Sequence, residues 1–146
     1  MSALKRQFAV TSGMHTSARN WQRVVQTRLG HHGVSPGCIN PLLLIGRSGG
    51  GLRQVELAQQ LGMEGPSLVR LLDKLAGLGL VRRQCDANDR RANQLWLTDA
   101  GQALYGQIEE GLIALRREVL AEMSNAELDA VLKFYRLMEE AASNTP

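Results

Sequence analysis

The sequence predicts a mainly helical α+β fold, with about six helices and one β-hairpin, and three observations lead to this prediction. Of the 146 residues, 44% are hydrophobic but only 4% are aromatic, and the abundant Leu and Ala favour helices. Most segments repeat apolar residues at the spacing of one helix face. Residues 80–97 instead carry two short strand-like segments around a turn-rich centre, which indicates a hairpin.

The first two helices are predicted from a periodic stripe and from a proline. Residues 7–30 form the first, because one helical face carries Met14, Ala18, Trp21 and Val25. Ser35 is the expected N-cap of the second helix, with Pro36 in its first turn. Pro41 either bends this helix or marks a later start, and residues 49–51, all glycine, end it.

Two shorter helices are predicted next. Residues 52–53 form a short extended piece. Residues 54–61 form a helix with Val55, Ala58 and Leu61 inward, and Gly62 lies just past its end. Pro66 begins a helix that runs to about residue 78, and its apolar stripe consists of Leu68, Leu71, Leu72 and Leu75.

The hairpin and two long helices complete the chain. Residues 80–85 and 94–97 are the expected strands, joined through the turn residues 86–89. Thr98 is the predicted cap of a long helix that reaches about residue 123. Ser124 and Glu127 have the spacing of a capping box, which predicts the start of the last helix.

The order of short helix, turn, helix and hairpin is that of a winged helix-turn-helix, a fold that binds double-stranded DNA. A helix with one buried stripe leaves its opposite face free for a major groove. Here that face carries Glu64, Ser67, Arg70, Asp73 and Lys74. Arg70 can bond guanine through two parallel hydrogen bonds, and Ser67 can donate to a phosphate or a base. The alternative is an ordinary solvated helix face.

The hairpin strengthens the DNA-binding hypothesis because its tip and first strand are rich in arginine. The tip holds Asp89, Arg90 and Arg91, and the first strand holds Arg82 and Arg83 as support for this wing. Arginines at a hairpin tip suit insertion into a narrow minor groove. Asp89 would repel phosphate unless it orients an arginine, which is the role we expect for it. The alternative is a charged tip that protects the hairpin from aggregation.

At these residues the chain resembles the MarR family, in particular its SlyA-like branch. The resemblance is dense over about residues 52–104. It rests on Leu57-Ala58, on Gly65-Pro66-Ser67-Leu68-Val69-Arg70, on Leu72-Asp73-Lys74-Leu75, on Gly79-Leu80-Val81-Arg82-Arg83, on Asp89-Arg90-Arg91-Ala92 and on Leu97-Thr98-Asp99-Ala100-Gly101. Outside that stretch the support is the order of the helices.

The resemblance implies a transcription regulator that binds a pseudo-palindromic operator as a homodimer. Residues 1–146 would form a single MarR-type domain, with intertwined dimerisation helices at about 7–34 and 98–143 and a DNA-binding lobe at about 35–97. The regulator would act as a repressor or anti-silencer, relieved by a small aromatic or anionic effector. The residues expected in the major groove are Pro66, Ser67, Val69, Arg70 and Lys74, and Arg90 with its neighbour Arg91 would enter the minor groove.

An effector pocket is the least specified part of this hypothesis. A phenolic or aromatic carboxylate effector would pair with a cation, and the candidate residues are His15, Arg19, Trp21 and Arg47. The alternative places Trp21 in the dimer core and Arg19 on the surface.

Charge is distributed unevenly along the chain, which bears on binding to DNA and on packing between two copies of the chain. Residues 1–53 carry seven basic residues and no acids, residues 54–97 carry six basic and five acidic, and residues 98–146 carry four basic and nine acidic. A polyanion would prefer the first two thirds. The acidic last third could pack against the basic first third, within a chain or across a dimer. Both segments could equally be ordinary solvated faces.

Three rival interpretations were weighed. Cys38 or Cys85 could sense redox state, and His31 with His32 and Cys38 could bind a metal, although buried hydrophobes and a solvated loop are the simpler interpretations. A winged helix can also serve protein contacts alone. Enzyme activity is not expected, because no nucleophile motif or phosphate-binding loop is present.

The sequence also predicts where the protein works. Neither a membrane span nor a leader peptide is expected, since no apolar segment approaches the required length. No metal and no cofactor are expected. A reduced bacterial cytoplasm is the expected location, with the protein bound to the nucleoid when it binds DNA.

Overall fold

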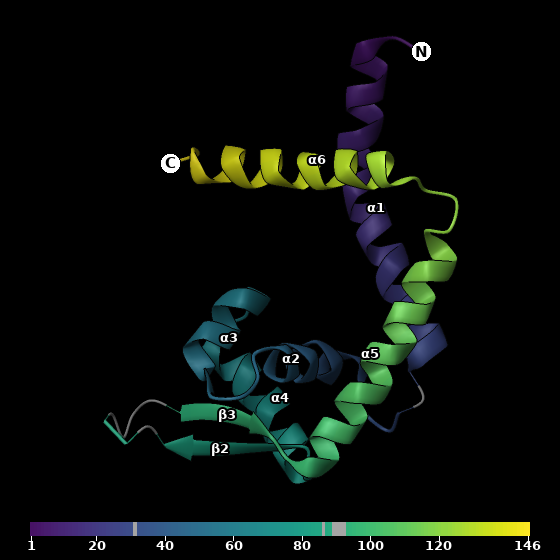
Figure 1. Ribbon diagram of the computed structural model, residues 1–146. Coiled ribbons are helices and arrows are strands. Elements are labelled where there is room, and N and C mark those ends of the chain that lie inside the picture. Colours follow the sequence, from purple (N-terminus) through teal and green to yellow (C-terminus); the bar gives the residue numbers. More distant parts are fainter. Residues whose placement is uncertain (31, 86, 89–92) are drawn as a thin grey trace. The chain divides into compact units, whose positions relative to one another are not determined.

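The computed structural model describes residues 1–30, 32–85, 87–88 and 93–146, and the chain divides into two compact units, Met1–Leu112 and Ile113–Pro146. The described residues form six helices and three strands (Figure 1), which confirms the predicted mainly helical winged helix-turn-helix. In chain order, the elements are α1 (Ala3–Leu29), α2 (Pro36–Arg47), β1 (Leu52–Arg53), α3 (Gln54–Leu61), α4 (Gly65–Gly77), β2 (Val81–Cys85), β3 (Asn93–Leu97), α5 (Asp99–Val119) and α6 (Asn125–Ser143).

The helix boundaries differ from the predicted ones at the start of α1 and at the end of α5, which stops at Val119 rather than at about residue 123. α1 begins at Ala3 rather than at residue 7, and the Ser2 hydroxyl accepts a hydrogen bond from the Lys5 N–H at 3.4 Å. α2 runs unbroken from Pro36 to Arg47 with Pro41 inside it. Pro41 therefore does not mark a later start, and as the sixth residue of α2 it removes one i→i−4 hydrogen bond from the interior of the helix.

The hairpin is part of a three-stranded antiparallel sheet in the order β1-β3-β2. Leu52 of β1 lies opposite Leu95 of β3, and Val81 of β2 lies opposite Leu97. Residues 52–53 were expected only as an extended piece, and their pairing with β3 was not predicted. Because strand side chains alternate between faces, this register places the buried Leu52, Val81, Leu95 and Leu97 on one face of the sheet.

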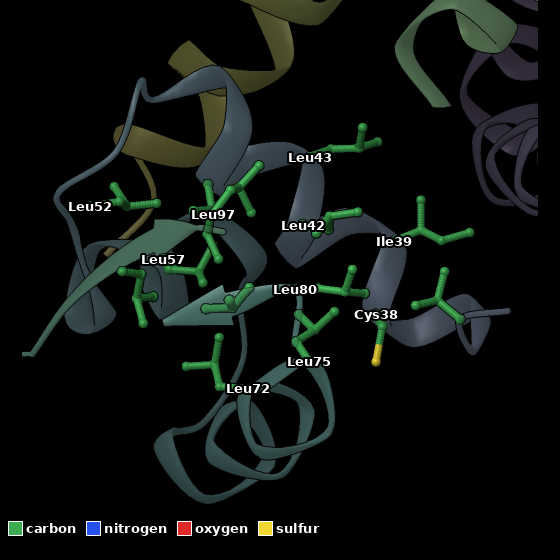
Figure 2. Close-up of a cluster of buried hydrophobic side chains, with 14 of the residues drawn as sticks. Cys38, Ile39, Leu42, Leu43, Leu52, Leu57, Leu72, Leu75, Leu80 and Leu97 are labelled. Atoms are coloured by element: carbon green, nitrogen blue, oxygen red, sulfur yellow. The ribbon is translucent and has the colours of Figure 1, made fainter. Parts of the chain in front are cut away.

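That face closes over a leucine-rich core contributed by α2, α3 and α4. Leu42, Leu57 and Leu72 are fully buried, and Figure 2 shows them in one cluster with Leu52, Leu75, Leu80 and Leu97. Burial of each such side chain contributes about 1.5–3 kcal/mol. Val55 was expected to point inward, but it is 60% exposed, and Leu57 takes the core position of α3. The expectation for Val55 was therefore wrong.

A glycine turn holds the sheet against the end of α2. Gly50 has φ +99°, and a Cβ added to it would collide with the indole of Trp96. The Gly51 N–H donates to the Leu95 carbonyl at 3.0 Å. Only glycine combines this backbone conformation with such a close approach, so the turn both ends α2 and fixes the entry into β1.

The three predicted helix caps lie where they were expected, and two of them make a side-chain capping bond. The Thr98 hydroxyl accepts from the Gly101 N–H at 3.0 Å at the start of α5. At the start of α6, the Ser124 hydroxyl accepts from the Glu127 N–H at 3.3 Å, and the Glu127 carboxylate accepts from the Ser124 N–H at 2.8 Å. Ser35 is the N-cap of α2 as expected, but its side chain makes no capping bond, and its hydroxyl donates to the Cys38 sulfur at 3.3 Å.

The same capping box affects the ionisation of Glu127. The backbone N–H and the hydroxyl of Ser124 stabilise the charged carboxylate, and they hold the pKa of Glu127 below its ordinary value.

None of the described helices is both long enough and apolar enough to cross a membrane.

Candidate nucleic-acid interface

Helix α4 separates an apolar face from a polar one. Leu68, Leu72 and Leu75 are fully buried, and the exposed residues on the rest of the helix include Pro66, Ser67, Val69, Arg70 and Lys74. These five are the side chains predicted for the major groove. The buried stripe fixes α4 to the lobe, so the polar face is held rigidly toward solvent.

The first turn of α4 has no side-chain cap. Glu64 is the N-cap residue and makes no side-chain capping hydrogen bond, while Pro66 lies in the first turn. The N–H groups at a helix start carry partial positive charge and favour an anion. Here, however, Glu64 adds a carboxylate at the same end and Pro66 has no N–H to donate.

The two arginines of β2 point to opposite faces of the sheet. Arg82 lies opposite Trp96 in the ladder, and its guanidinium is 5.2 Å from the centre of that indole. Arg82 also donates to Gln84 Oε1 at 3.2 Å. Arg83 points to the face that covers α4. The support predicted for the wing thus involves two different partners, an aromatic ring for Arg82 and α4 for Arg83.

Arg83 binds α4 through two acceptors. Its Nη2 donates to Asp73 Oδ1 at 2.8 Å and to the Val69 carbonyl at 3.4 Å. Asp73 lies on the polar face of α4 as expected, and the sequence indicated no role for it. No local pattern could have found this contact, because it joins a helix to a strand that follows it.

The predicted wing tip lies outside the described residues. Asp89, Arg90 and Arg91 belong to the segment that joins β2 to β3, and their roles stay predictions. The strands on either side are described, from Val81 to Cys85 and from Asn93 to Leu97.

The four candidate effector residues have different surroundings. His15 and Arg19 are exposed on α1, while Trp21 is half-buried and packs against the core cluster. Arg47, at the end of α2, forms an ion pair with Glu109 of α5. The Nε of Arg47 therefore already binds a protein carboxylate, with which a ligand carboxylate would compete.

The cysteines also differ in exposure. Cys38 is buried in the core, whereas Cys85 is exposed and its thiol donates to Asn93 Oδ1 at 3.9 Å. Over the described part of the chain, no group of three or more His, Cys, Asp or Glu side chains could hold a metal ion. His31, named for a metal alternative, lies outside that part.

Comparison with known proteins gives the same architecture. Residues 32–92 match the MarR family. The crystal structure of transcriptional regulator PA3341 is 33% identical, and the match covers 93% of this chain and 99% of that one with a TM-score of 0.85. A MarR mutant from E. coli, solved in complex with operator DNA, is 20% identical with a TM-score of 0.78, over 94% of this chain and 99% of that one.

The SlyA-like branch is not singled out by these comparisons. The structure of the transcriptional regulator SlyA is 17% identical with a TM-score of 0.80, over 92% of this chain and 94% of that one. At this identity the likeness shows the fold alone. The assignment to that branch therefore stays a prediction.

Proposed function

Because this chain belongs to the MarR family of transcription regulators, we propose that it binds a pseudo-palindromic operator as a homodimer and regulates transcription in a sequence-specific way. The observation that carries the proposal is the polar face of α4. Ser67, Arg70 and Lys74 are exposed there, opposite three fully buried leucines. A helix held in this way can enter a major groove about 12 Å wide without unfolding any part of the lobe.

Arg70 is the expected base-reading residue. It lies in the second turn of α4, and N-terminal residues of a recognition helix are those that reach base edges. A bidentate contact from Arg to guanine discriminates by about 1–3 kcal/mol. Lys74, one turn further along, would contact a phosphate instead. Pro66, Ser67 and Val69 would complete the surface that faces the groove.

The wing extends this interface to the minor groove. β2 and β3 pair along all five residues of each strand, so the two strands form a ribbon that leads to the predicted wing tip. Arg90 and Arg91 in that segment would enter the adjacent minor groove, where the negative potential is strongest over narrow A·T-rich sequence.

Apolar side chains on the terminal helices support the homodimer. Neither α1 nor α6 contains a buried residue. Large hydrophobic side chains are exposed on both, namely Leu4, Phe8, Val10 and Met14 of α1 and Val131, Leu132, Tyr135, Leu137 and Met138 of α6. A second copy would cover them, and the basic first third would meet the acidic last third. Two lobes would then read half-sites about 34–36 Å apart.

We test DNA binding by selecting bound sequences from a random duplex pool. The expected result is an enriched inverted repeat, bound with an affinity that falls steeply as salt is raised, because cationic side chains release counterions from phosphates. A duplex of the same composition in scrambled order is the control. No enrichment, or a complex insensitive to salt, would contradict the proposal.

We propose that the regulator is a repressor relieved by a small aromatic carboxylate. The support is the position of Arg47, whose pairing with Glu109 joins the DNA-binding lobe to α5. A ligand carboxylate that took the place of Glu109 would alter this junction. Titration of salicylate-like acids against the operator complex should release DNA from the wild type and not from Arg47→Met. Unchanged affinity across a panel of such acids would contradict this part of the proposal.

A further inference from the structure

The contact between Arg83 and α4 has a consequence for DNA reading. We propose that Arg83 is a positioning residue of the DNA interface, which binds Asp73 and so keeps this carboxylate from pairing with Arg70. The inference rests on the proposed function. It explains how Arg70 stays free to bind a base, and why Asp73 can lie on a surface that must approach phosphates.

The spacing of Arg70 and Asp73 along α4 would allow the two side chains to pair if Arg83 did not bind Asp73. Asp73 follows Arg70 by three residues, and side chains at i and i+3 of a helix are neighbours that attract when their charges are opposite. A carboxylate bound to Arg70 would occupy the N–H groups needed for guanine. The pair would also place a negative charge at the groove, where it meets phosphate.

The structure shows Asp73 bound elsewhere. Its Oδ1 accepts from Arg83 Nη2 at 2.8 Å, although its side chain is 60% exposed. Among the described residues, Arg70 makes no side-chain hydrogen bond or ion pair. The carboxylate is therefore neutralised by a cation from β2, and the guanidinium of Arg70 is available to a ligand.

The geometry of Arg83 makes this arrangement stable. The same Nη2 also donates to the Val69 carbonyl at 3.4 Å, and the side chain is only 30% exposed. An arginine held at a backbone carbonyl and a carboxylate has a fixed direction, which a single flexible ion pair lacks. Both acceptors belong to the turn that carries Arg70, so Arg83 fixes the strand against the reading helix at that turn.

The neighbouring Arg82 provides a matched control. It lies on the same strand and carries the same charge, but its guanidinium stacks on Trp96 on the opposite face. Arg82→Met and Arg83→Met therefore remove the same charge from the same strand. Only the second releases Asp73.

The experiment measures operator affinity for Arg83→Met, Asp73→Ala, the double variant and Arg82→Met, using the duplex selected with wild-type protein. Arg83→Met should bind about fivefold more weakly, because at both half-sites Asp73 then competes for Arg70 and brings an unneutralised charge close to phosphate. Asp73→Ala should stay within about twofold of wild type, and so should the double variant, because the competing carboxylate is gone. Arg82→Met should lose less than Arg83→Met.

A coupling measurement separates positioning from a purely structural role. Arg70→Ala should cost much less in the Arg83→Met background than in the wild type, because Arg70 is already occupied there. Arg83→Lys, which can still pair with Asp73, should restore binding to within about twofold of wild type. This variant keeps the test valid if Arg83→Met unfolds, as judged by circular dichroism.

The outcomes distinguish the two levels of the proposal. If wild-type protein enriches no sequence, the proposed function fails. If wild type binds and the double variant stays as weak as Arg83→Met, Asp73 is not the cause and the positioning role is overturned. Equal losses for Arg82→Met and Arg83→Met, or an undiminished effect of Arg70→Ala, would overturn it as well.

Discussion

Helices α4 and α6 have the same kind of amphipathic sequence, but the apolar stripe is buried in α4 and exposed in α6. In α4, Leu68, Leu72 and Leu75 are fully buried, whereas α6 has no buried residue and Leu132 is 52% exposed. An apolar stripe predicts that a helix will be covered, but it does not say by what. In α4 the cover is the rest of the lobe, and in α6 we expect it to be a second copy of the chain.

The largest expected effect concerns the stripe of α4. Leu72→Ala should lower the free energy of unfolding by about 2–5 kcal/mol, because it leaves a cavity in a packed core. Urea denaturation followed by circular dichroism measures this change. Val69→Ala, an exposed position on the same helix, is the control and should change stability by less than about 1 kcal/mol. Equal effects at both positions would contradict the burial described for α4.

A charge in the stripe of α6 should instead affect association. Leu132→Lys should weaken the dimer by about 2–3 kcal/mol, because an unpaired cation would be buried at the interface. Sedimentation velocity over a concentration series measures the shift toward monomer. Ala130→Lys introduces the same charge on the opposite side of α6 and should leave the dimer intact. A dimer that survives Leu132→Lys would show that α6 has another partner.

The polar face of α4 should matter for DNA but not for stability. Arg70→Ala should cost about 1–2 kcal/mol of operator binding and relax the preference at one or two base pairs. Lys74→Ala should weaken binding to all sequences alike and reduce the salt dependence. Competition binding with single-base operator variants distinguishes the two patterns. Uniform loss for Arg70→Ala would remove its base-reading role.

The smallest expected effect is a pH dependence of helicity that comes from the first turn of α6 and has no counterpart in the first turn of α4. The capping box of α6 lowers the pKa of Glu127, whereas Glu64 of α4 makes no capping bond. A lowered folded-state pKa means that stabilisation is complete above the unfolded pKa and disappears as the pH falls through the folded value. Helicity measured against pH should therefore decrease on the acid side in the wild type.

The control for this pH dependence is Glu127→Gln, which has no carboxylate to titrate. Its helicity should be lower than that of the wild type at neutral pH, and the difference should vanish in acid. A difference that persists below the folded pKa would mean that the box acts without ionisation of Glu127.

The sequence predicted most of the fold because its signals are local. The leucine stripe of α4, the caps at Thr98 and Ser124, and the hairpin each depend on residues within one or two turns of each other. Two details were wrong or absent for the same reason. Val55 fits a helical stripe as well as Leu57 does, and residues 52–53 are too short to predict a strand.

The site was predictable only in part. The exposed positions of Ser67, Arg70 and Lys74 follow from the stripe on the other side of α4, so the sequence could place them. Arg83 could be assigned to the wing, but its partner could not be named. Arg47 could be named as a candidate cation for an effector, but its ion pair with Glu109 could not be foreseen.

The sequence by itself determined which segments are helices and which side of α4 is polar. Periodicity and capping are properties of a few consecutive residues, so no knowledge of the rest of the chain is needed. The tertiary structure alone decided that Asp73 pairs with Arg83 and Arg47 with Glu109. In each pair the two charges lie on different elements, and only the packing of these elements determines which opposite charges come within reach.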